Sequence, residues 1–461
     1  MNRTLPLILT AALLLTACTS AVPAQPADAT TSPDAAASSP AQPDAAASSP
    51  AQPDAAASSP AQPDAETSAP PLTPKFPVGL LLTLPQNQNS GPVWNTGDAF
   101  YELRDASNMT PEALVLKTDY AALTQSVYCD IPGCTHDSDA CPAYLASDFC
   151  VGVMAVDGTV YTYPGELTNV APTQIYRIDP AVGKTPVAAV PDALPHHMQL
   201  QWCDEYALYG CPLAASHQPG TLYRWDWQND TVQTIPMLAD EKIIACEGSR
   251  FLTIRIEANE PFPNFGSTEQ EKAILAHAVY VYAWLDPATG AREKICTRPY
   301  ADGYFHNYYD GRIYYTGNFR NADPPGQQAA LLYFDTADGT EKTLLETIPF
   351  DTYGIDVCEP FSPAFAGVPQ RYLRVLNVGD AYADCLLDME TDDVLPAPAV
   401  TAEGVRRPAL LLACTASGQW LTTANPRDSY DPQYSLYALW DPADFLADGQ
   451  PATWVTMYAT E

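Results

Sequence analysis

Hydrophobic and polar residues alternate along this 461-residue chain in short runs that do not fit the period of a helix. One phrase recurs, in which an aromatic or aliphatic run enters a turn that begins with aspartate, as in IYRIDPAVG, LYRWDWQND and LLYFDTADG. The aspartates of the copies stand 47 to 60 residues apart, at Asp119, Asp179, Asp226, Asp286, Asp335, Asp388 and Asp441. Because Asp, Pro and Gly favour tight reversals, each copy predicts a strand followed by a turn.

Each copy of the phrase has further strand-like runs around it. A Tyr- or Val-rich run precedes it, as in GTVYTYPG and GRIYYTG; another stands upstream, as in KIIACEG; and one follows, as in REKICTR. Four short strands per repeat predict an all-β fold, namely a β-propeller of seven four-stranded blades over residues 76–461. A β-sandwich with accidental internal similarity is the alternative.

The two ends of this predicted domain are also apolar and strand-like. PVGLLLTLP occupies 77–85, and ATWVTMYA occupies 452–459. Propellers usually close their ring by pairing the two ends of the chain, so we expect these segments in the same blade or in adjacent blades.

The N-terminal 75 residues differ from the rest of the chain in composition and pattern. Arg3 precedes an apolar run from Leu5 to Leu15, which is too short to span a bilayer and predicts a signal peptide over 1–17. The run ends in Leu-Thr-Ala-Cys and resembles the lipobox of bacterial lipoproteins, which implies cleavage before Cys18 and its diacylation. Residues 18–75 repeat SPAQPDAAAS, a composition that predicts a lipidated, disordered tether.

Charge narrows the choice of partners. The chain carries 22 basic and 55 acidic residues, a net charge of −33, and residues 76–461 alone carry a net charge of −29. Such a surface repels nucleic acid and anionic lipid, but it tolerates cations, basic peptides and neutral glycans.

Eleven cysteines follow Cys18, an odd number that cannot pair completely within one chain. Five of them recur at one position of the repeat, each at the end of a strand shortly before the Tyr-rich strand, which predicts small buried side chains: Cys150, Cys203, Cys246, Cys358 and Cys414. A disulfide between Cys203 and Cys211 across a hairpin is a further alternative.

Three cysteines and a histidine gather in the loop CDIPGCTHDSDAC, at Cys129, Cys134, His136 and Cys141. Three thiolates and an imidazole match a tetrahedral structural zinc site, although the paired C-x2-C knuckles of stronger motifs are missing. A disulfide among these cysteines, a disulfide from Cys141 to Cys150, and free thiols are the alternatives.

The phrase VYCDIPGCTHDSDACPAY is similar to a stretch of uncharacterised secreted lipoproteins of gut Gram-positive bacteria. The resemblance covers the lipobox, this loop and the Tyr-rich cadence of the domain. It implies a lipid-anchored protein on the extracellular face of the membrane with a propeller-like domain, and it supplies no reaction.

Motifs that would indicate catalysis are not found: the sequence has no G-x-S-x-G, H-E-x-x-H, P-loop or G-x-G-x-x-G pattern. His196 and His197 are minor candidates for a site, as is the aromatic group Tyr304, Phe305, His306, Tyr308 and Tyr309, which more often packs between blades. The leading hypothesis is a surface-anchored, non-enzymatic propeller that binds a protein, peptide or glycan. The alternatives are an extracellular carbohydrate-active hydrolase or lyase that uses carboxylates at the propeller mouth, and a structural component without a ligand.

Overall fold

The computed structural model describes residues 82–83, 86–87, 91–105, 112–146, 151–156, 158–167, 174–212, 217–261, 268–300, 305–317, 329–348, 358–360, 371–378, 383–396, 399–402, 405–424, 436–447 and 453–458. The predicted signal peptide and tether, together with Cys18, Cys150 and Tyr304, lie outside these residues.

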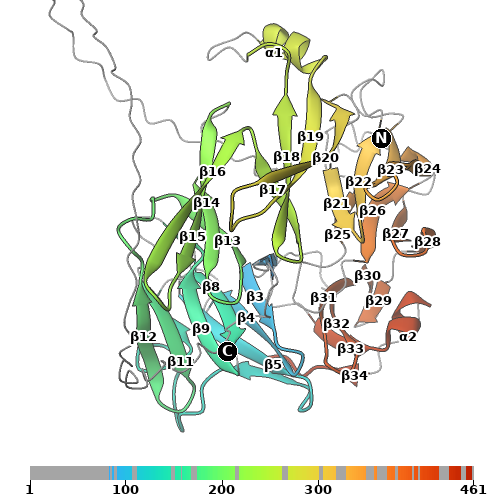
Figure 1. Cartoon of the computed structure of the whole chain (residues 1–461). Helices are drawn as coiled ribbons and strands as arrows, with labels where there is room; N and C mark the ends of the chain where they lie inside the picture. Colours follow the sequence, from blue (N-terminus) through green and yellow to red (C-terminus); the bar gives the residue numbers. More distant parts are fainter. Residues whose placement is uncertain are drawn as a thin grey trace, which may run out of the picture. The chain divides into compact units, whose positions relative to one another are not determined.

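Seven antiparallel sheets follow one another along the chain and form a seven-bladed β-propeller, as the repeat predicts (Figure 1). Blade 1 comprises β2 (Gln86–Asn87), β3 (Gly91–Asn95), β4 (Ala99–Asp105), β5 (Ala113–Asp119), β6 (Thr124–Val127) and β7 (Tyr144–Leu145). Blade 2 comprises β8 (Val151–Val156), β9 (Thr159–Pro164), β11 (Gln174–Asp179) and β12 (Gly183–Ala189). Blade 3 comprises β1 (Leu82–Thr83), β10 (Glu166–Leu167), β13 (Met198–Cys203), β14 (Leu208–Pro212), β15 (Pro219–Asp226) and β16 (Thr231–Ala239).

The remaining blades have four strands each. Blade 4 comprises β17 (Lys242–Glu247), β18 (Arg250–Glu257), β19 (Val279–Leu285) and β20 (Arg292–Pro299), with α1 (Thr268–Leu275) between β18 and β19. Blade 5 comprises β21 (Phe305–Tyr309), β22 (Arg312–Gly317), β23 (Ala329–Asp335) and β24 (Glu341–Ile348). Blade 6 comprises β25 (Cys358–Pro360), β26 (Tyr372–Val378), β27 (Ala383–Asp388) and β28 (Asp393–Pro396). After the hairpin of β29 (Ala399–Ala402) and β30 (Val405–Pro408), blade 7 comprises β31 (Leu410–Cys414), β32 (Trp420–Ala424), β33 (Leu436–Trp440) and β34 (Thr453–Trp454), with α2 (Pro442–Leu446).

In six of the seven blades a recurring aspartate explains why the strand next to the outermost one stops where it does. In six blades the aspartate carboxylate accepts a hydrogen bond from a backbone N–H two residues further on, as Asp179 does from Ala181 at 3.0 Å and Asp335 from Ala337 at 2.9 Å. The same bond forms at Asp119, Asp226, Asp286 and Asp388. This side-chain bond replaces a backbone bond and reverses the chain. Asp441 is the exception, because Pro442 opens the short helix α2 there and the Asp441 side chain makes no cap.

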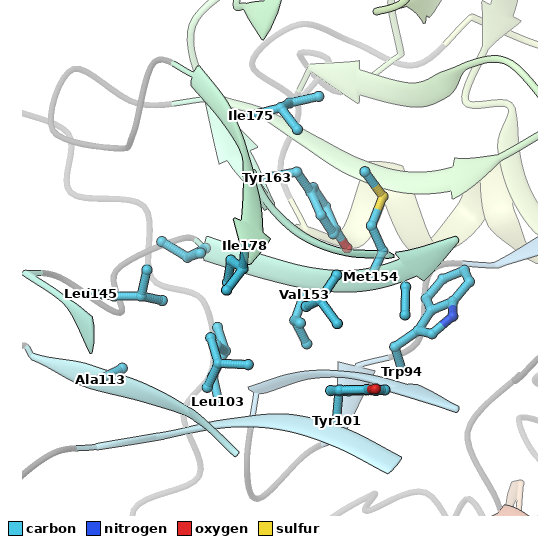
Figure 2. Packing of buried hydrophobic residues seen from close by; sticks show 14 of the residues in the cluster. Trp94, Tyr101, Leu103, Ala113, Leu145, Val153, Met154, Tyr163, Ile175 and Ile178 are labelled. Carbon is cyan, nitrogen blue, oxygen red and sulfur yellow. The ribbon is translucent and has the colours of Figure 1, made fainter. Parts of the chain in front are cut away.

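Apolar side chains between neighbouring sheets form the core. Figure 2 shows Trp94, Tyr101 and Leu103 of blade 1 beside Val153 and Met154 of blade 2, all of them buried. Gly152 on β8 fits this packing, since a Cβ atom there would lie 2.1 Å from Cζ of Tyr163. No helix among the described residues is long and apolar enough to cross a membrane.

The prediction that the two ends of the domain lie in the same blade or in adjacent blades is wrong for the N-terminal segment. Residues 82–83 form β1, which pairs with β13 of blade 3, whereas β34 pairs with β33 of blade 7. Strands β1 and β10 both pair with the edge of β13 that faces away from β14, so they supply ladder partners that this first strand of blade 3 would otherwise lack. The C-terminal segment instead joins the last blade to the first: the N–H of Gln125 donates to the Thr456 carbonyl at 2.8 Å, and the N–H of Thr456 donates to the Leu123 carbonyl at 2.9 Å.

Candidate metal centre and a cavity on the turn side

The cysteine-rich loop is an excursion of the outer strand of blade 1. Strand β6 pairs with the second half of β5, and β7 pairs with its first two residues, Ala113 and Leu114. Between them Val115 receives both ends of the loop: its N–H donates to the Ala143 carbonyl at 2.9 Å, and its carbonyl accepts from the N–H of Tyr128 at 2.9 Å. The outer strand therefore leaves the sheet and returns on the two sides of one residue.

Tight turns within the excursion bring the candidate ligands together. The N–H of Cys134 donates to the Ile131 carbonyl, and the N–H of Cys141 donates to the Ser138 carbonyl at 2.9 Å. His136 has φ of 58°, a left-handed conformation that bulky residues rarely adopt. That conformation turns the chain between Cys134 and Cys141.

The four predicted ligands lie in one cluster that could hold a metal ion. One ligand atom from each of Cys129, Cys134, His136 and Cys141 lies within 4.8 Å of all the others. Nδ1 of His136 is 3.3 Å from Sγ of Cys141. Around a tetrahedral zinc ion, bonds of about 2.3 Å to sulfur and about 2.0 Å to nitrogen place the ligand atoms roughly 3.5–3.8 Å apart. The residues present therefore fit such an ion, with no position left open for water or substrate.

The thiols differ in their tendency to ionise. Burial raises the pKa of Cys141 to about 12 and also raises the pKa of Cys129. The backbone N–H of His136 lowers the pKa of Cys134. A bound dication reverses the effect of burial, because a coordinating thiol loses its proton.

The loop also docks on the neighbouring blade. The N–H of Asp130 donates to the Pro180 carbonyl at 2.8 Å, in the aspartate-led turn of blade 2. Lys184, on the outer strand β12, donates to Asp139 at 3.0 Å and to the Tyr144 carbonyl. The cluster thus lies between the outer strands of blades 1 and 2, where it can hold two blades together.

The thiols of Cys129, Cys134 and Cys141 are free in the structure. Cys203 and Cys211 are also free thiols, and the register opposes Cys203 to Leu208 and Cys211 to Gln199. The hairpin disulfide is therefore absent from this part of the chain. Cys203 is fully buried at the end of β13, as the repeat position predicts, whereas Cys246 in β17 and Cys414 at the end of β31 are only partly buried. Cys358 begins β25 instead of ending a strand, and its side chain lies outside the described part of the chain.

The minor candidates for a site, the histidine pair and the described residues of the aromatic group, are not gathered into a common site. His196 and His197 are exposed in the connection that leads to β13. Tyr308 packs edge-on against Trp284 of blade 4, with ring centroids 5.4 Å apart, and donates to Glu247 at 3.0 Å. His306 contacts Thr316 on the neighbouring strand. Tyr308 and Phe305 thus pack between blades 4 and 5, as expected, whereas Tyr309 packs against the core between blades 5 and 6.

Sequence reasoning missed a cavity of about 490 Å³ between blades 3 and 4. It is formed by the turn between β13 and β14, the turn between β17 and β18, and the aspartate-led turn after β19. In an antiparallel sheet, first-to-second and third-to-fourth connections fall at the same end of the strands, so these turns converge. The lining residues are Asp204, Glu205, Tyr206, Tyr209, Arg224, Gln233, Ser249, Asp286, Pro287 and Ala288. The sequence signals are the Asp-Glu-Tyr segment at 204–206 and the aspartate-led turn at Asp286, and neither predicts a cavity, because the cavity requires two blades to meet.

A fixed polar group forms one wall of this cavity. Nε of Arg224 donates to Oδ2 of Asp204 at 2.9 Å, and the Tyr209 hydroxyl donates to the same oxygen at 2.6 Å. The backbone N–H groups of Tyr206 and Ala207 donate to Oδ1 of Asp204 at 2.7 and 2.8 Å. With this many bonds, Asp204 holds the wall in one arrangement.

No protein-family model matches the chain, and no curated protein matches it either. Among solved structures, it is similar to the acylaminoacyl peptidase of Pyrococcus horikoshii, with 11% identity, 78% of this chain and 51% of that chain covered, and a TM-score of 0.42. It is similar to the β-propeller domain of the Trilobed protease from Pyrococcus furiosus, with 9% identity, coverage of 78% and 94%, and a TM-score of 0.41. Puromycin hydrolase matches with 12% identity, coverage of 80% and 54%, and a TM-score of 0.41. The chain spans about half the length of the first and third of these proteins.

Proposed function

We propose that this protein is a surface-anchored lipoprotein whose propeller is a non-enzymatic binding module for an extracellular protein, peptide or glycan. The observation that carries the proposal is the cavity of about 490 Å³ between blades 3 and 4. Ligand sites in proteins occupy about 300–1,000 Å³ and combine aromatic walls with a few placed polar groups. Tyr206, Tyr209 and the Asp204–Arg224 pair supply both kinds of group here.

The surroundings of Asp286 and Asp204, two of the three cavity carboxylates, favour binding over glycoside cleavage. A glycosidase needs one carboxyl group with a raised pKa to act as the acid. The pKa of Asp286 is instead lowered, by hydrogen bonds from the Thr289 hydroxyl and the Ala288 backbone N–H. Asp204 is engaged by Arg224 and Tyr209, so it is committed to positioning the wall.

In this proposal the metal cluster is a structural zinc site. When bound, zinc would supply a four-ligand crosslink between Cys129, Cys134, His136 and Cys141 and would hold the excursion against blade 2. The docking bonds of Asp130 and Lys184 support this role, since they keep the loop on the outer strands of two blades. A closed tetrahedral site of this kind contributes to folding and leaves no position for a substrate.

The anchor follows from the resemblance of residues 15–18 to a lipobox. Lipidation at Cys18 would attach the chain to the extracellular face of the membrane, and the proline-rich segment 19–75 would extend the propeller from the surface.

Binding of the full chain to arrays of immobilised peptides and glycans tests the function. We expect at least one ligand class to be retained without being cleaved, and we expect Ala288→Trp, which places a large side chain in the cavity, to abolish retention. Ala337→Trp is the matched control, because Ala337 holds the equivalent turn position in blade 5, donating to Asp335 as Ala288 donates to Asp286. Retention that survives Ala288→Trp, or cleavage of an arrayed glycan, would contradict the proposal.

A further inference from the structure

The charge of the cavity indicates which ligands it takes. Three carboxylates line it, those of Asp204, Glu205 and Asp286, and among its lining residues, all of which are described, Arg224 is the one basic side chain. Arg224 and Asp204 are ion-paired at 2.9 Å, with side chains 17% and 18% exposed, and they neutralise each other. The formal charges of the lining residues therefore sum to −2, three carboxylates against one guanidinium.

The geometry of the turn keeps one of these charges in place. Oδ1 of Asp286 accepts from the Ala288 N–H at 2.8 Å, and Oδ2 accepts from the Thr289 hydroxyl at 2.7 Å. The carboxylate is thus oriented by its own turn on one side of the cavity. Glu205 stands in the facing turn of blade 3.

The aromatic lining suits a cation with a flat or apolar body. Tyr209 is buried and already takes the guanidinium of Arg224, whose carbon lies 5.8 Å from the ring centroid, so Tyr206 is the aromatic side chain left for a ligand. Tyr206 and Pro287 add apolar surface beside the carboxylates. A guanidinium or ammonium group on an aliphatic stem can use both features, with the stem on Tyr206 and Pro287 and the charge at the carboxylates.

We propose that this cavity binds the cationic side chain of a basic protein or peptide, an arginine above all. The inference rests on the proposed function and narrows its ligand to one class. The net charge of −29 on residues 76–461 supports it, because a negative surface attracts a basic partner and accelerates its association at low ionic strength.

Calorimetric titration of the full chain with the peptide acetyl-Arg-Arg-Arg-amide tests the inference, with acetyl-Cit-Cit-Cit-amide, its neutral isostere, as the ligand control. We expect the arginine peptide to bind and the citrulline peptide not to bind. Glu205→Gln and Asp286→Asn should each weaken binding about 1.5- to 5-fold, the effect of one exposed charge pair. Higher salt should weaken binding further because it screens the charges.

Asp179→Asn is the matched protein control. Asp179 makes the same turn in blade 2 and accepts the Ala181 N–H at 3.0 Å, but it does not line the cavity. The amide keeps the turn acceptor at either position, so Asp179→Asn should leave binding unchanged.

Two outcomes separate this inference from the proposed function. Suppose that a neutral or acidic ligand is retained on the array and that Ala288→Trp abolishes its retention. That result would overturn the cationic ligand class but would agree with the proposed binding module. If no ligand, the arginine peptide included, requires the cavity for binding, both the inference and the proposed function are overturned.

Discussion

Tyr437, on the third strand of blade 7, donates a hydrogen bond to Oε2 of Glu102 on blade 1 at 2.6 Å. Both side chains are buried, 335 positions apart in the sequence. Oε1 of Glu102 accepts from Gln125 and, at 3.3 Å, from Arg104. Arg104 also donates to the Tyr458 carbonyl in the C-terminal segment. The ring is therefore closed by a buried polar cluster as well as by the backbone pairing at Thr456.

Removing the hydroxyl of Tyr437 should loosen this closure. Tyr437→Phe leaves Glu102 without one donor in a buried place, which costs about 1–3 kcal/mol of unfolding free energy. Denaturant titration of Tyr437→Phe, Glu102→Gln and the double variant measures the coupling, which we expect at about 0.5–3 kcal/mol. Simple additivity of the two single effects would show that the bond contributes nothing to closure.

The pH dependence of this closure has a definite sign. Burial raises the pKa of Glu102, against the opposing effect of the Arg104 charge and of the hydrogen bonds from Tyr437 and Gln125. The folded state thus binds this proton more tightly than the unfolded state. The contribution of Glu102 to stability therefore falls as pH rises above the unfolded value of about 4.3. The unfolding free energy of the wild type minus that of Glu102→Gln should decrease from pH 4 to pH 7, and an increase would contradict the account.

Glu241 should show the opposite dependence. Burial acts to raise the pKa of Glu241, but hydrogen bonds from Arg292 and from the Leu238 N–H, with the Arg292 charge, leave that pKa below its usual value. Nε and an Nη of Arg292 approach the carboxylate at 2.8 and 2.6 Å. The stabilisation is therefore present above a pH of about 4.3 and is lost as pH falls through the folded pKa.

Glu241→Gln should cost about 1.5–3 kcal/mol of unfolding free energy at pH 7, the usual range for hydrogen bonds to charged groups, and less below pH 4. Glu257→Gln is the control, since Glu257 pairs with Arg255 while 53% exposed and should change stability by less than about 1 kcal/mol. Denaturation curves at several pH values give both numbers. A cost for Glu241→Gln that does not depend on pH would contradict the ionic origin of the stabilisation.

Loss of one ligand should release the metal and destabilise the contact between the outer strands of blades 1 and 2. We expect Cys134→Ser and His136→Ala each to lower the zinc content and the melting temperature of the purified chain, because an incomplete ligand set binds zinc less tightly. A chelator should lower the melting temperature of the wild type in the same way. Cys211→Ala is the control, since Cys211 lies in blade 3 outside the cluster. Equal melting temperatures for wild type, ligand variants and chelated protein would contradict a structural role.

The features that could be predicted from the sequence are local ones. Each aspartate-led turn is made by a side chain that bonds its own backbone, so Asp179 or Asp335 marks the end of a strand without help from the rest of the fold. The ligands Cys129, Cys134, His136 and Cys141 lie within thirteen residues, and short turns suffice to gather them.

The features that could not be predicted depend on contacts between blades. Asp204 and Asp286 line one cavity because blades 3 and 4 are neighbours, and no periodicity records that contact. Leu82 and Thr83 pair with the edge of β13 that faces away from β14. The sequence shows only an apolar run at the start of the domain, which does not indicate that partner.

A closed metal centre at Cys129, Cys134, His136 and Cys141 leaves no position for a ligand in the loop, and the cavity between blades 3 and 4 is then the place for one. X-ray absorption at the zinc edge, on the full chain purified without oxygen, measures the ligand set of this metal centre most directly. The prediction is one zinc per chain with three sulfur ligands at about 2.3 Å and one nitrogen ligand at about 2.0 Å. A chain that contains no zinc, and whose mass is about two daltons lower for each disulfide formed among Cys129, Cys134 and Cys141, would contradict it.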